Sequence, residues 1–411
     1  MLNEPLSTVW LGSRCHQETE TGWRGASHVA TIVMFNGESA HNVIRDRVAL
    51  DAKLFEARGH DVMVIDLSNL QSLRVPRQID LFIGYQGWGR DIKLGDGSLL
   101  VERFGCPYAV MLGDHPIQHA ARIEELPGNT VLFVASREHR TFLQQALKVQ
   151  FDIRLFTSTI SASTPLPAVE RDLPVLMVGQ AMAPDDFLAG HKMPEQVRRI
   201  VDECLERAAR NPHADPVADY MNSGYSRVLD LVGAPASAIQ VGRLVDLAAR
   251  YQYRWSYVQE LRKLPVTFVG DSWVAMKRQP CDAFNALPSL PYEELPGLYA
   301  RAQIGLNLFA PYFDFHERLL DMMVQSAVAA TAKTSWLSEL FDFGTELLAL
   351  PDSPADVAGW LDHALSDQQR LAQIGARGRA KVQADFNDET RIDRLLELVD
   401  EAAPPAVRAH G

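Results

Sequence analysis

The chain has 411 residues, of which 47% are hydrophobic and 22% are charged, and its formal net charge at pH 7 is −12. These are ordinary values for a globular protein, and the length suits two domains better than one core. The acidic balance argues against a nucleic acid partner, because nucleic acid phosphates need a basic protein face.

Cysteine usage and hydropathy point to a reducing, aqueous compartment. The four cysteines show no spacing typical of a zinc site or of a disulfide framework: Cys15, Cys106, Cys204 and Cys281. No apolar run approaches 20 residues, and the first residues lack the pattern of a signal peptide. We therefore expect a cytoplasmic protein without a transmembrane segment.

The first part of the chain, after an unassigned leader of about 27 residues, alternates apolar runs with amphipathic helical patterns. This alternation is typical of a parallel α/β sheet. The predicted strands are His28–Phe35, Asp61–Leu67, Ile79–Tyr85, Tyr108–Leu112, Val131–Ala135 and Ile153–Thr157. The predicted helices are Val43–Arg58, Gly97–Phe104, Ile117–Leu126 and Glu138–Lys148.

Residues 161–174 cluster Ser, Thr and Pro without a period, which indicates a linker. The predicted domains are therefore residues 1–168 and 172–390, followed by a C-terminal helix and tail at 391–411. The second domain is predicted to begin with the strand Leu173–Val178 and to carry a helical insertion at 194–263. Its later elements are a strand and loop at Val266–Trp273, a helix at Tyr292–Ala302, a strand at Ile304–Ala310 and a helix that opens at His316.

That last helix carries a cation and an acid one turn apart, Arg318 and Asp321. In an open α/β sheet, phosphates and riboses bind at the carboxyl ends of the strands and at the first turns of the helices that follow. The pair therefore lies where a sugar nucleotide needs a positive charge and an acceptor for a hydroxyl. The same spacing also suits a simple surface ion pair.

A series of motifs extends from this helix in both directions: Phe268-Val269-Gly270 with Trp273, Leu290 to Pro296, Leu298-Tyr299-Ala300, Ile304 with Asn307, Arg318 to Asp321, and Glu339-Leu340-Phe341. With these motifs, about the last 140 residues resemble the donor half of glycosyltransferases with the GT-B fold. The similarity is to the group 1 branch and its CgeB-like spore-maturation proteins. The first domain resembles the family mainly in its pattern of elements.

The resemblance implies an α/β fold with two Rossmann-like domains that face each other across a cleft. It also implies a hexosyltransferase or related glycosyltransferase, which moves a sugar from a nucleotide-sugar donor to a protein, glycan or lipid-linked acceptor. Three positions depart from the family. Relatives usually carry Glu where this chain has Asp321, often Gly at Ser326, and in some cases Glu at Phe313. An inactive nucleotide-binding protein, or another sugar-nucleotide enzyme such as an epimerase, is the alternative.

Glycosyl transfer needs a stabilised diphosphate, an acceptor that loses a proton, and the exclusion of water. For the diphosphate we expect Arg318 with the neighbouring His316 and Glu317, and the turn at Gly179 and Gln180. The nucleoside is expected at Gly270, Trp273 and Tyr292. Two of these assignments have simpler alternatives, because Gly179 suits a plain strand-end turn and Trp273 suits the core under the loop.

The acceptor half is predicted from loops at strand ends. Asp114 and His115 follow the strand Tyr108–Leu112, and either could act as the base, although Asp114 could instead cap the next helix. Glu38, in the loop after the first strand, is a third catalytic candidate. The residues expected to bind the acceptor are Asn36, Gly37, His41, Gln86 and Trp88. Since the chain has no Asp-x-Asp motif, we expect neither a catalytic metal nor a cofactor besides the sugar nucleotide.

Overall fold

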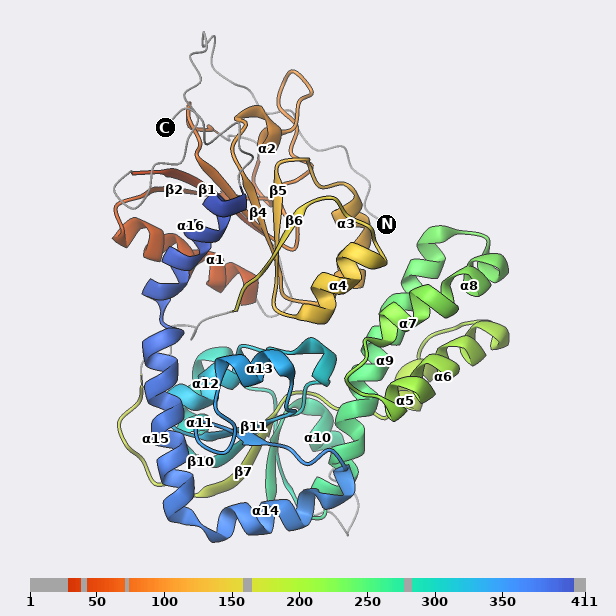
Figure 1. Ribbon diagram of the computed structural model, residues 1–411, viewed down its shortest axis with the longest axis vertical. Helices are drawn as coiled ribbons and strands as arrows, with labels where there is room; N and C mark the ends of the chain where they lie inside the picture. The colour runs from red at the N-terminus through yellow and green to blue at the C-terminus, as the bar shows by residue number, and fades with distance from the viewer. Residues whose placement is uncertain (1–28, 38–42, 71–73, 158–164, 277–282, 403–411) are drawn as a thin grey trace. The chain divides into compact units, whose positions relative to one another are not determined.

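The computed structural model describes residues 29–37, 43–70, 74–157, 165–276 and 283–402 (Figure 1). These residues fall into two units, each built on a six-stranded sheet. Unit 1 consists of the described parts of Met1–Val134, Leu147–Phe156 and Asp388–Gly411. Unit 2 consists of Ala135–Ala146 and the described parts of Thr157–Asn387.

In unit 1 the strand order is β2-β1-β3-β4-β5-β6, and every neighbouring pair is parallel. The strands are β1 (Thr31–Asn36), β2 (Asp61–Asp66), β3 (Leu81–Tyr85), β4 (Tyr108–Leu112), β5 (Thr130–Val134) and β6 (Asp152–Leu155). The helices are α1 (Val43–Ala57), α2 (Leu100–Arg103), η2 (Pro116–His119), α3 (Ala120–Glu124) and α16 (Asp388–Ala402). All six predicted strands are therefore present, each with ends within a few residues of the predicted ones.

The core of unit 1 lies between this sheet and the helices α1 and α16 (Figure 1). Phe55 of α1 and Leu395 of α16 are buried against apolar strand residues such as Met34 and Ile83. The C-terminal helix α16 therefore completes the hydrophobic core of a sheet formed by the first part of the chain.

A buried ionic network joins α16 to α1 and β3. The Arg391 guanidinium donates to the Asp51 carboxylate at 2.5 and 3.0 Å and to the Tyr85 hydroxyl at 3.2 Å. Asp51 and Arg391 are 1% and 5% exposed. Burial alone would raise the pKa of Asp51, but the charges of Arg391 and Arg47 hold it below the usual carboxyl value.

In unit 2 the strand order is β12-β11-β10-β7-β8-β9, again with parallel neighbours. The strands are β7 (Leu173–Val178), β8 (Val266–Val269), β9 (Asn285–Leu287), β10 (Ala302–Asn307), β11 (Val328–Thr331) and β12 (Leu348–Ala349). The prediction of β7 is confirmed residue for residue. Strands β9, β11 and β12 were not predicted from the sequence, and the two central alanines of β11 have little intrinsic preference for strand.

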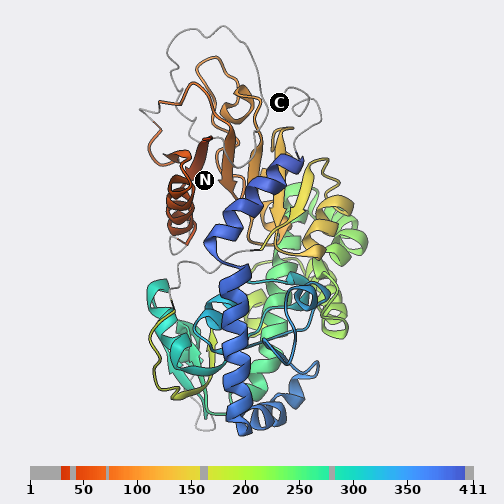
Figure 2. The same ribbon diagram turned by 60° about the vertical axis from the view of Figure 1, so that its left-hand side comes forward.

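Unit 2 has further helices outside its insertion. They are α4 (Arg137–Gln145), α10 (Asp271–Met276), η3 (Tyr292–Glu294), α11 (Leu295–Arg301), η4 (Pro311–Phe313), α12 (Arg318–Val324), α13 (Ser335–Leu340), η5 (Pro354–Asp356), α14 (Val357–Ser366) and α15 (Gln368–Asp385). The long helix α15 packs against α12 and β11 (Figures 1 and 2). No helix among the described residues is long and apolar enough to span a membrane.

The helical insertion of unit 2 has a core of its own. It consists of α5 (Pro184–Ala189), α6 (Glu195–Arg210), α7 (Pro216–Ser223), α8 (Tyr225–Val232) and the first part of α9 (Pro235–Leu261). Breaks occur near the expected Asn211-Pro212 and at Gly233, which has a φ of +70° and ends α8. Helix α9 then continues into the sheet core through Tyr257, Val258 and Leu261. Helix α9 therefore connects the core of the insertion to the core of the sheet.

We expect Arg391→Met to destabilise the protein by about 3 kcal/mol, because the substitution leaves the Asp51 carboxylate buried beside only one remaining arginine. Urea unfolding followed by circular dichroism would measure the change. The control is Arg394→Met, which removes an exposed ion pair with Glu397 on the same helix and should cost less than about 1 kcal/mol. Equal losses in the two variants would contradict a structural role for the buried pair.

The same pair predicts a pH dependence. A carboxyl whose pKa is lowered on folding contributes stability above its unfolded pKa, near 4, and loses that contribution as the pH falls through the folded pKa. The wild-type protein should therefore lose more stability than Arg391→Met between about pH 7 and about pH 3. Urea midpoints of both proteins at several pH values would show that the difference in stability between them shrinks on acidification. A difference that stays constant would refute the role given to the Arg391–Asp51 pair.

Candidate functional site

The strand order of unit 2 reverses between β7 and β10, because β8 and β9 lie beyond one of them and β11 and β12 beyond the other. In open α/β sheets, ligands bind at such a reversal, outside the carboxyl ends of the strands. Gly179 follows β7, and Leu308 and Phe309 follow β10. These residues therefore occupy the position at which this fold type places a ligand.

Two arginines converge on Gly179. A Cβ atom placed on this glycine would lie 3.6 Å from Nη1 of Arg318 and 3.9 Å from Nη1 of Arg254. Gly179 has a φ of +130°, which side chains of L residues rarely adopt, so the turn leaves its backbone open toward the guanidinium groups. Both guanidinium groups also lie over the Phe309 ring, 5.5 and 5.7 Å from its centroid.

The electrostatics of this arginine pair are unusual. Burial, together with the neighbouring charge of Arg318, lowers the pKa of Arg254 to about 10. Arg254 donates hydrogen bonds to the carbonyl oxygens of Gln180 and Leu308. Among the described residues, neither guanidinium forms an ion pair with a carboxylate. Two like charges held together without a protein counter-ion are the arrangement expected of an anion-binding site.

His316 and Glu317 lie directly beside this pair. The Nδ1 atom of His316 accepts a hydrogen bond from the Arg318 backbone N–H at 3.2 Å, and its ring contacts the Phe309 ring with centroids 3.8 Å apart. The Glu317 carboxylate, half exposed, lies 3.8 Å from Nε2 of His316. The structure thus brings Gly179, His316 and Arg318 together as expected, and it adds Arg254 and Phe309.

Arg254 was not among the predicted site residues, because it lies in the second half of α9, in a segment whose sequence indicates only a helix. One signal was available. Arg254 is the only charged residue in the run from Tyr251 to Tyr257, which is otherwise aromatic or neutral. A guanidinium surrounded by aromatic residues on a half-buried helix face is typical of a functional arginine.

Gln180 holds the neighbouring loops in place. Its Oε1 accepts from the Ser272 backbone N–H at 3.0 Å, and its Nε2 donates to the Ser289 hydroxyl at 3.0 Å. The Ser289 backbone N–H in turn donates to the Asp271 carboxylate at 2.8 Å. Both ends of the Gln180 amide therefore connect the loops after β7, β8 and β9. Gln180, which was expected to contact the diphosphate, thus has a structural role in the turn.

Gly270 and Trp273 both contact the turn at Gly179. A Cβ atom on Gly270, whose φ is +148°, would lie 2.9 Å from the Gly179 carbonyl oxygen, so only glycine fits. Trp273 is 1% exposed, stacks on Phe268 and donates from its indole N–H to the Gly179 carbonyl at 2.5 Å. The predicted stacking of Trp273 on a base is therefore wrong, because the ring lies under the loop as a core residue.

Tyr292 and Asp321 form a second contact of this site. The Tyr292 hydroxyl donates to the Asp321 carboxylate at 2.6 Å. Asp321 is only 2% exposed, whereas Tyr292 is 40% exposed. This burial excludes the alternative in which Arg318 and Asp321 form a surface ion pair.

Two departures from the expected family pattern are accommodated locally. The Phe313 ring is 4% exposed and lies between the Arg250 guanidinium, 4.0 Å from its centroid, and the His139 ring, with centroids 4.6 Å apart. Ser326 has a φ of +57°, a conformation that glycine adopts at a lower cost than serine. The carboxylate expected in some relatives at position 313 is thus replaced by a buried aromatic contact.

In unit 1, several predicted acceptor residues do lie together at the carboxyl ends of β1, β3 and β4. The Trp88 ring lies over Gly37, where a Cβ atom would come within 3.4 Å of it. The Asn36 side chain accepts from the Gly37 N–H at 2.8 Å. Gln86, which has a φ of +53°, approaches the Asp114 carboxylate with its Nε2 at 3.4 Å. Glu38 and His41 lie outside the described residues.

The prediction of His115 as a base is wrong in this structure. His115 is 0% exposed, and its Nδ1 accepts from the Ile117 backbone N–H at 3.1 Å, so it caps η2 in place of Asp114. The Asp114 side chain is 46% exposed and lies 3.8 Å from Nε2 of His119. His119, which the sequence analysis did not identify, is therefore the histidine that accompanies Asp114.

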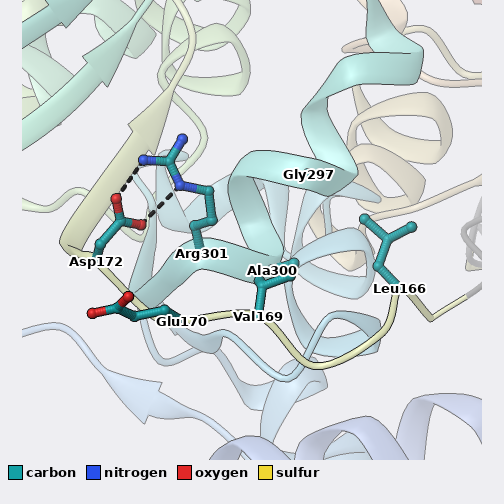
Figure 3. A pocket seen from close by; sticks show the side chains of 7 residues that line it. All are labelled: Leu166, Val169, Glu170, Asp172, Gly297, Ala300 and Arg301. Carbon is teal, nitrogen blue, oxygen red and sulfur yellow. Dashed lines mark hydrogen bonds and ion pairs between the residues drawn. The ribbon is translucent and has the colours of Figure 1, made fainter.

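A separate pocket of about 410 Å³ lies at the opposite end of β7 (Figure 3). Asp172, just before that strand, forms hydrogen bonds of 2.8 and 2.5 Å with Arg301 in its wall. The lining is otherwise mostly apolar: Leu166, Val169, Glu170, Gly297 and Ala300. Because β7 separates it from Gly179 by six residues of strand, roughly 20 Å, this pocket does not belong to the arginine site.

The described residues contain no group of three or more His, Cys, Asp or Glu side chains placed to hold a metal ion. Positive charge at the candidate site comes from Arg254 and Arg318.

The sequence and the structure were compared with those of known proteins. Residues 254–397 match the model of a family described as glycosyl transferase-like. None of the curated proteins matches the sequence. Among solved structures, sucrose-phosphate synthase from Thermosynechococcus elongatus is 12% identical, with 91% of this chain and all of that chain covered and a TM-score of 0.52.

Two further structures are similar to the same extent. Anabaena HepE in complex with UDP and glucose is 11% identical, with 90% of this chain and all of that one covered and a TM-score of 0.51. An alpha-glucosyltransferase in complex with UDP-glucose and DNA is 8% identical over 90% of this chain and all of that one, also with a TM-score of 0.51. These likenesses show the fold: it is the GT-B fold, with two Rossmann-like domains.

If His115 is a capping residue, His115→Ala should lower the free energy of unfolding by about 2 kcal/mol, because it removes the cap and leaves a small cavity. His115→Asn should recover part of that loss, since an amide oxygen can accept from the Ile117 N–H. Urea unfolding of the two variants would measure both effects. Unchanged stability in His115→Ala would contradict the structural role and reopen a catalytic one.

Proposed function

We propose that the protein is a glycosyltransferase that uses a nucleotide-sugar donor and binds the donor diphosphate between Gly179, Arg254 and Arg318. The observation that carries this proposal is the pair of arginines at the Gly179 turn, which has no carboxylate partner among the described residues and lies at the reversal point of the unit 2 sheet. Guanidinium groups match phosphate oxygens in charge and in hydrogen-bond geometry. An entering diphosphate would also relieve the repulsion between the two cations.

The same couple supplies the chemistry that the leaving group needs. When the glycosidic bond to the diphosphate breaks, negative charge grows on the β-phosphate oxygens. Two fixed guanidinium groups can stabilise that charge without reorganising. We therefore propose a transferase that needs no metal ion at the diphosphate, because Arg254 and Arg318 supply the positive charge.

For the acceptor, we propose that Asp114 takes the proton, with His119 beside it and Trp88 and Gln86 contributing contacts. Asp114 is half exposed at a strand end and approaches both His119 and Gln86. A carboxylate in hydrogen-bond reach of a hydroxyl is a suitable general base. Protein, glycan and lipid-linked acceptors all remain compatible with this chemistry.

Three observations support the proposal, and one of them indicates which donors to test first. The matched family model covers Arg254, Tyr292, Arg318 and Asp321. The structural neighbours include proteins in complex with UDP and with UDP-glucose, so UDP-sugars are the first donors to test. The motifs from Phe268 to Phe341 resemble those of the CgeB-like branch, to which we propose that the chain is related.

The proposal predicts that one of UDP, GDP, ADP and dTDP raises the unfolding temperature by on the order of 5 °C at about a hundredfold excess over its Kd. The corresponding nucleoside should have little effect, because the arginines contact the diphosphate. Arg254→Met and Arg318→Met should each abolish most of the shift, as measured by differential scanning fluorimetry.

The matched control is Arg210→Met, which removes a 76% exposed arginine from α6 in the same unit and should leave the shift unchanged. Unfolding temperatures without nucleotide would reveal any folding defect. A shift of equal size in the two site variants would refute the diphosphate assignment, and no shift with any of the four nucleotides would refute the proposed function. Binding without donor hydrolysis or transfer would favour a nucleotide-binding protein that has lost catalysis.

A further inference from the structure

The contact between Tyr292 and Asp321 joins a buried carboxylate to an exposed ring. Asp321 is on α12, three residues after Arg318, so the two side chains lie on the same face of the helix about one turn apart. A ligand whose diphosphate lies on Arg318 therefore has its adjoining group near Asp321. In a nucleotide that adjoining group is the ribose, whose hydroxyls need hydrogen-bond acceptors.

Asp321 itself is poorly placed to accept that hydrogen bond. It is 2% exposed, and its carboxylate already accepts from the Tyr292 hydroxyl at 2.6 Å. Tyr292, in contrast, is 40% exposed as a residue, and its hydroxyl is the group that contacts this carboxylate. A hydroxyl that donates its proton to a carboxylate still offers oxygen lone pairs as acceptors, and the negative partner makes the oxygen more basic.

The position of Tyr292 is fixed by the loops of the site. It begins η3, three residues after Ser289, whose hydroxyl accepts from Gln180 and from the Asp271 backbone N–H. The loop that carries Tyr292 is therefore tied to the turn that carries Gly179. A ring held in this way reaches Asp321 without depending on ligand, so its hydroxyl is already oriented when a nucleotide arrives.

We propose that Tyr292 is the residue that hydrogen-bonds a ribose hydroxyl of the bound nucleotide, and that Asp321 is a positioning residue that orients the Tyr292 hydroxyl. This inference rests on the proposed function, because it needs a nucleotide with its diphosphate on Arg254 and Arg318. The tyrosine hydroxyl lies 2.6 Å from the carboxylate of the short, buried aspartate, and in this proposal it takes over the contact with the ligand.

The opposite arrangement makes the opposite prediction. If the ribose bonded Asp321 directly, the nucleotide would have to displace the Tyr292 hydroxyl, and that hydroxyl would compete with the ligand. Removing it would then strengthen binding. Tyr292→Phe therefore separates the two arrangements by the sign of its effect.

The experiment is isothermal titration calorimetry of wild type and Tyr292→Phe with UDP, 2′-deoxy-UDP and 3′-deoxy-UDP, or with the matching ADP or GDP set if one of those binds in place of UDP. We expect wild type to bind one deoxynucleotide about tenfold more weakly than the parent. We expect Tyr292→Phe to bind the parent about tenfold more weakly than wild type does and to bind parent and deoxynucleotide equally. Loss of discrimination is the decisive readout, because a general structural defect would weaken all nucleotides alike.

Tyr225→Phe, on α8 in the helical insertion, is the matched control and should behave as wild type. Circular dichroism would check folding, and Tyr292→Leu would replace the phenylalanine variant if that one failed to fold. Unchanged or tighter binding of the parent nucleotide by the variant, with discrimination retained, overturns the inference while the proposed function stands. The inference is also overturned if wild type binds the parent nucleotide and both deoxynucleotides with equal affinity. No binding of any nucleotide by wild type overturns both.

Discussion

Two like charges held against one glycine are the constraint on which the donor side of this structure depends. Coulomb repulsion between Arg254 and Arg318 opposes their approach, and burial of Arg254 adds a desolvation cost. The fold offsets these costs with the Phe309 ring and with the carbonyl oxygens of Gln180 and Leu308. These neutral partners hold the arginines in place but leave net positive charge, and a charge that the protein leaves uncompensated favours an anionic ligand.

The convergence requires elements from distant parts of the chain. Arg318 comes from the helix after β10, whereas Arg254 comes from α9, whose first half is buried in the helical insertion. The second half of α9 packs in the sheet core through Tyr257, Val258 and Leu261. Because one continuous helix is buried in both cores, the insertion fixes the axial position of Arg254. The insertion therefore supports Arg254 at the candidate anion site.

The sequence predicted those parts of the structure that follow from local pattern. Alternating apolar runs gave all six strands of unit 1, and the rule that ligands gather at strand ends led to Gly179 and Arg318. Burial could not be inferred in the same way. Trp273 and His115 carry chemically suitable groups in suitable loops, yet each is fully engaged by its own surroundings. Whether a side chain points into solvent or into the core depends on packing that local spacing does not encode.

Contacts between distant residues were the second limit. Arg391 and Asp51 are 340 positions apart, and no local pattern marks either residue as ionic partner of the other. The same holds for Arg254, because the sequence does not distinguish it from the other polar residues of a long helix. Strand β11 is a third example, because its alanines favour a strand only between two parallel neighbours. In each case tertiary context overrides a weak local preference.

The positions where this chain departs from the expected family pattern are connected through one segment. Phe313 is buried against Arg250 of α9, while Arg318 and Asp321 follow within eight residues. An aromatic residue at position 313 anchors the loop after β10 to the helix that supplies Arg254. The change from Glu to Phe thus removes a carboxylate that would lower the positive potential near the arginine pair. The Asp321 carboxylate, in contrast, keeps its negative charge one helical turn from Arg318, where the Tyr292 hydroxyl donates to it.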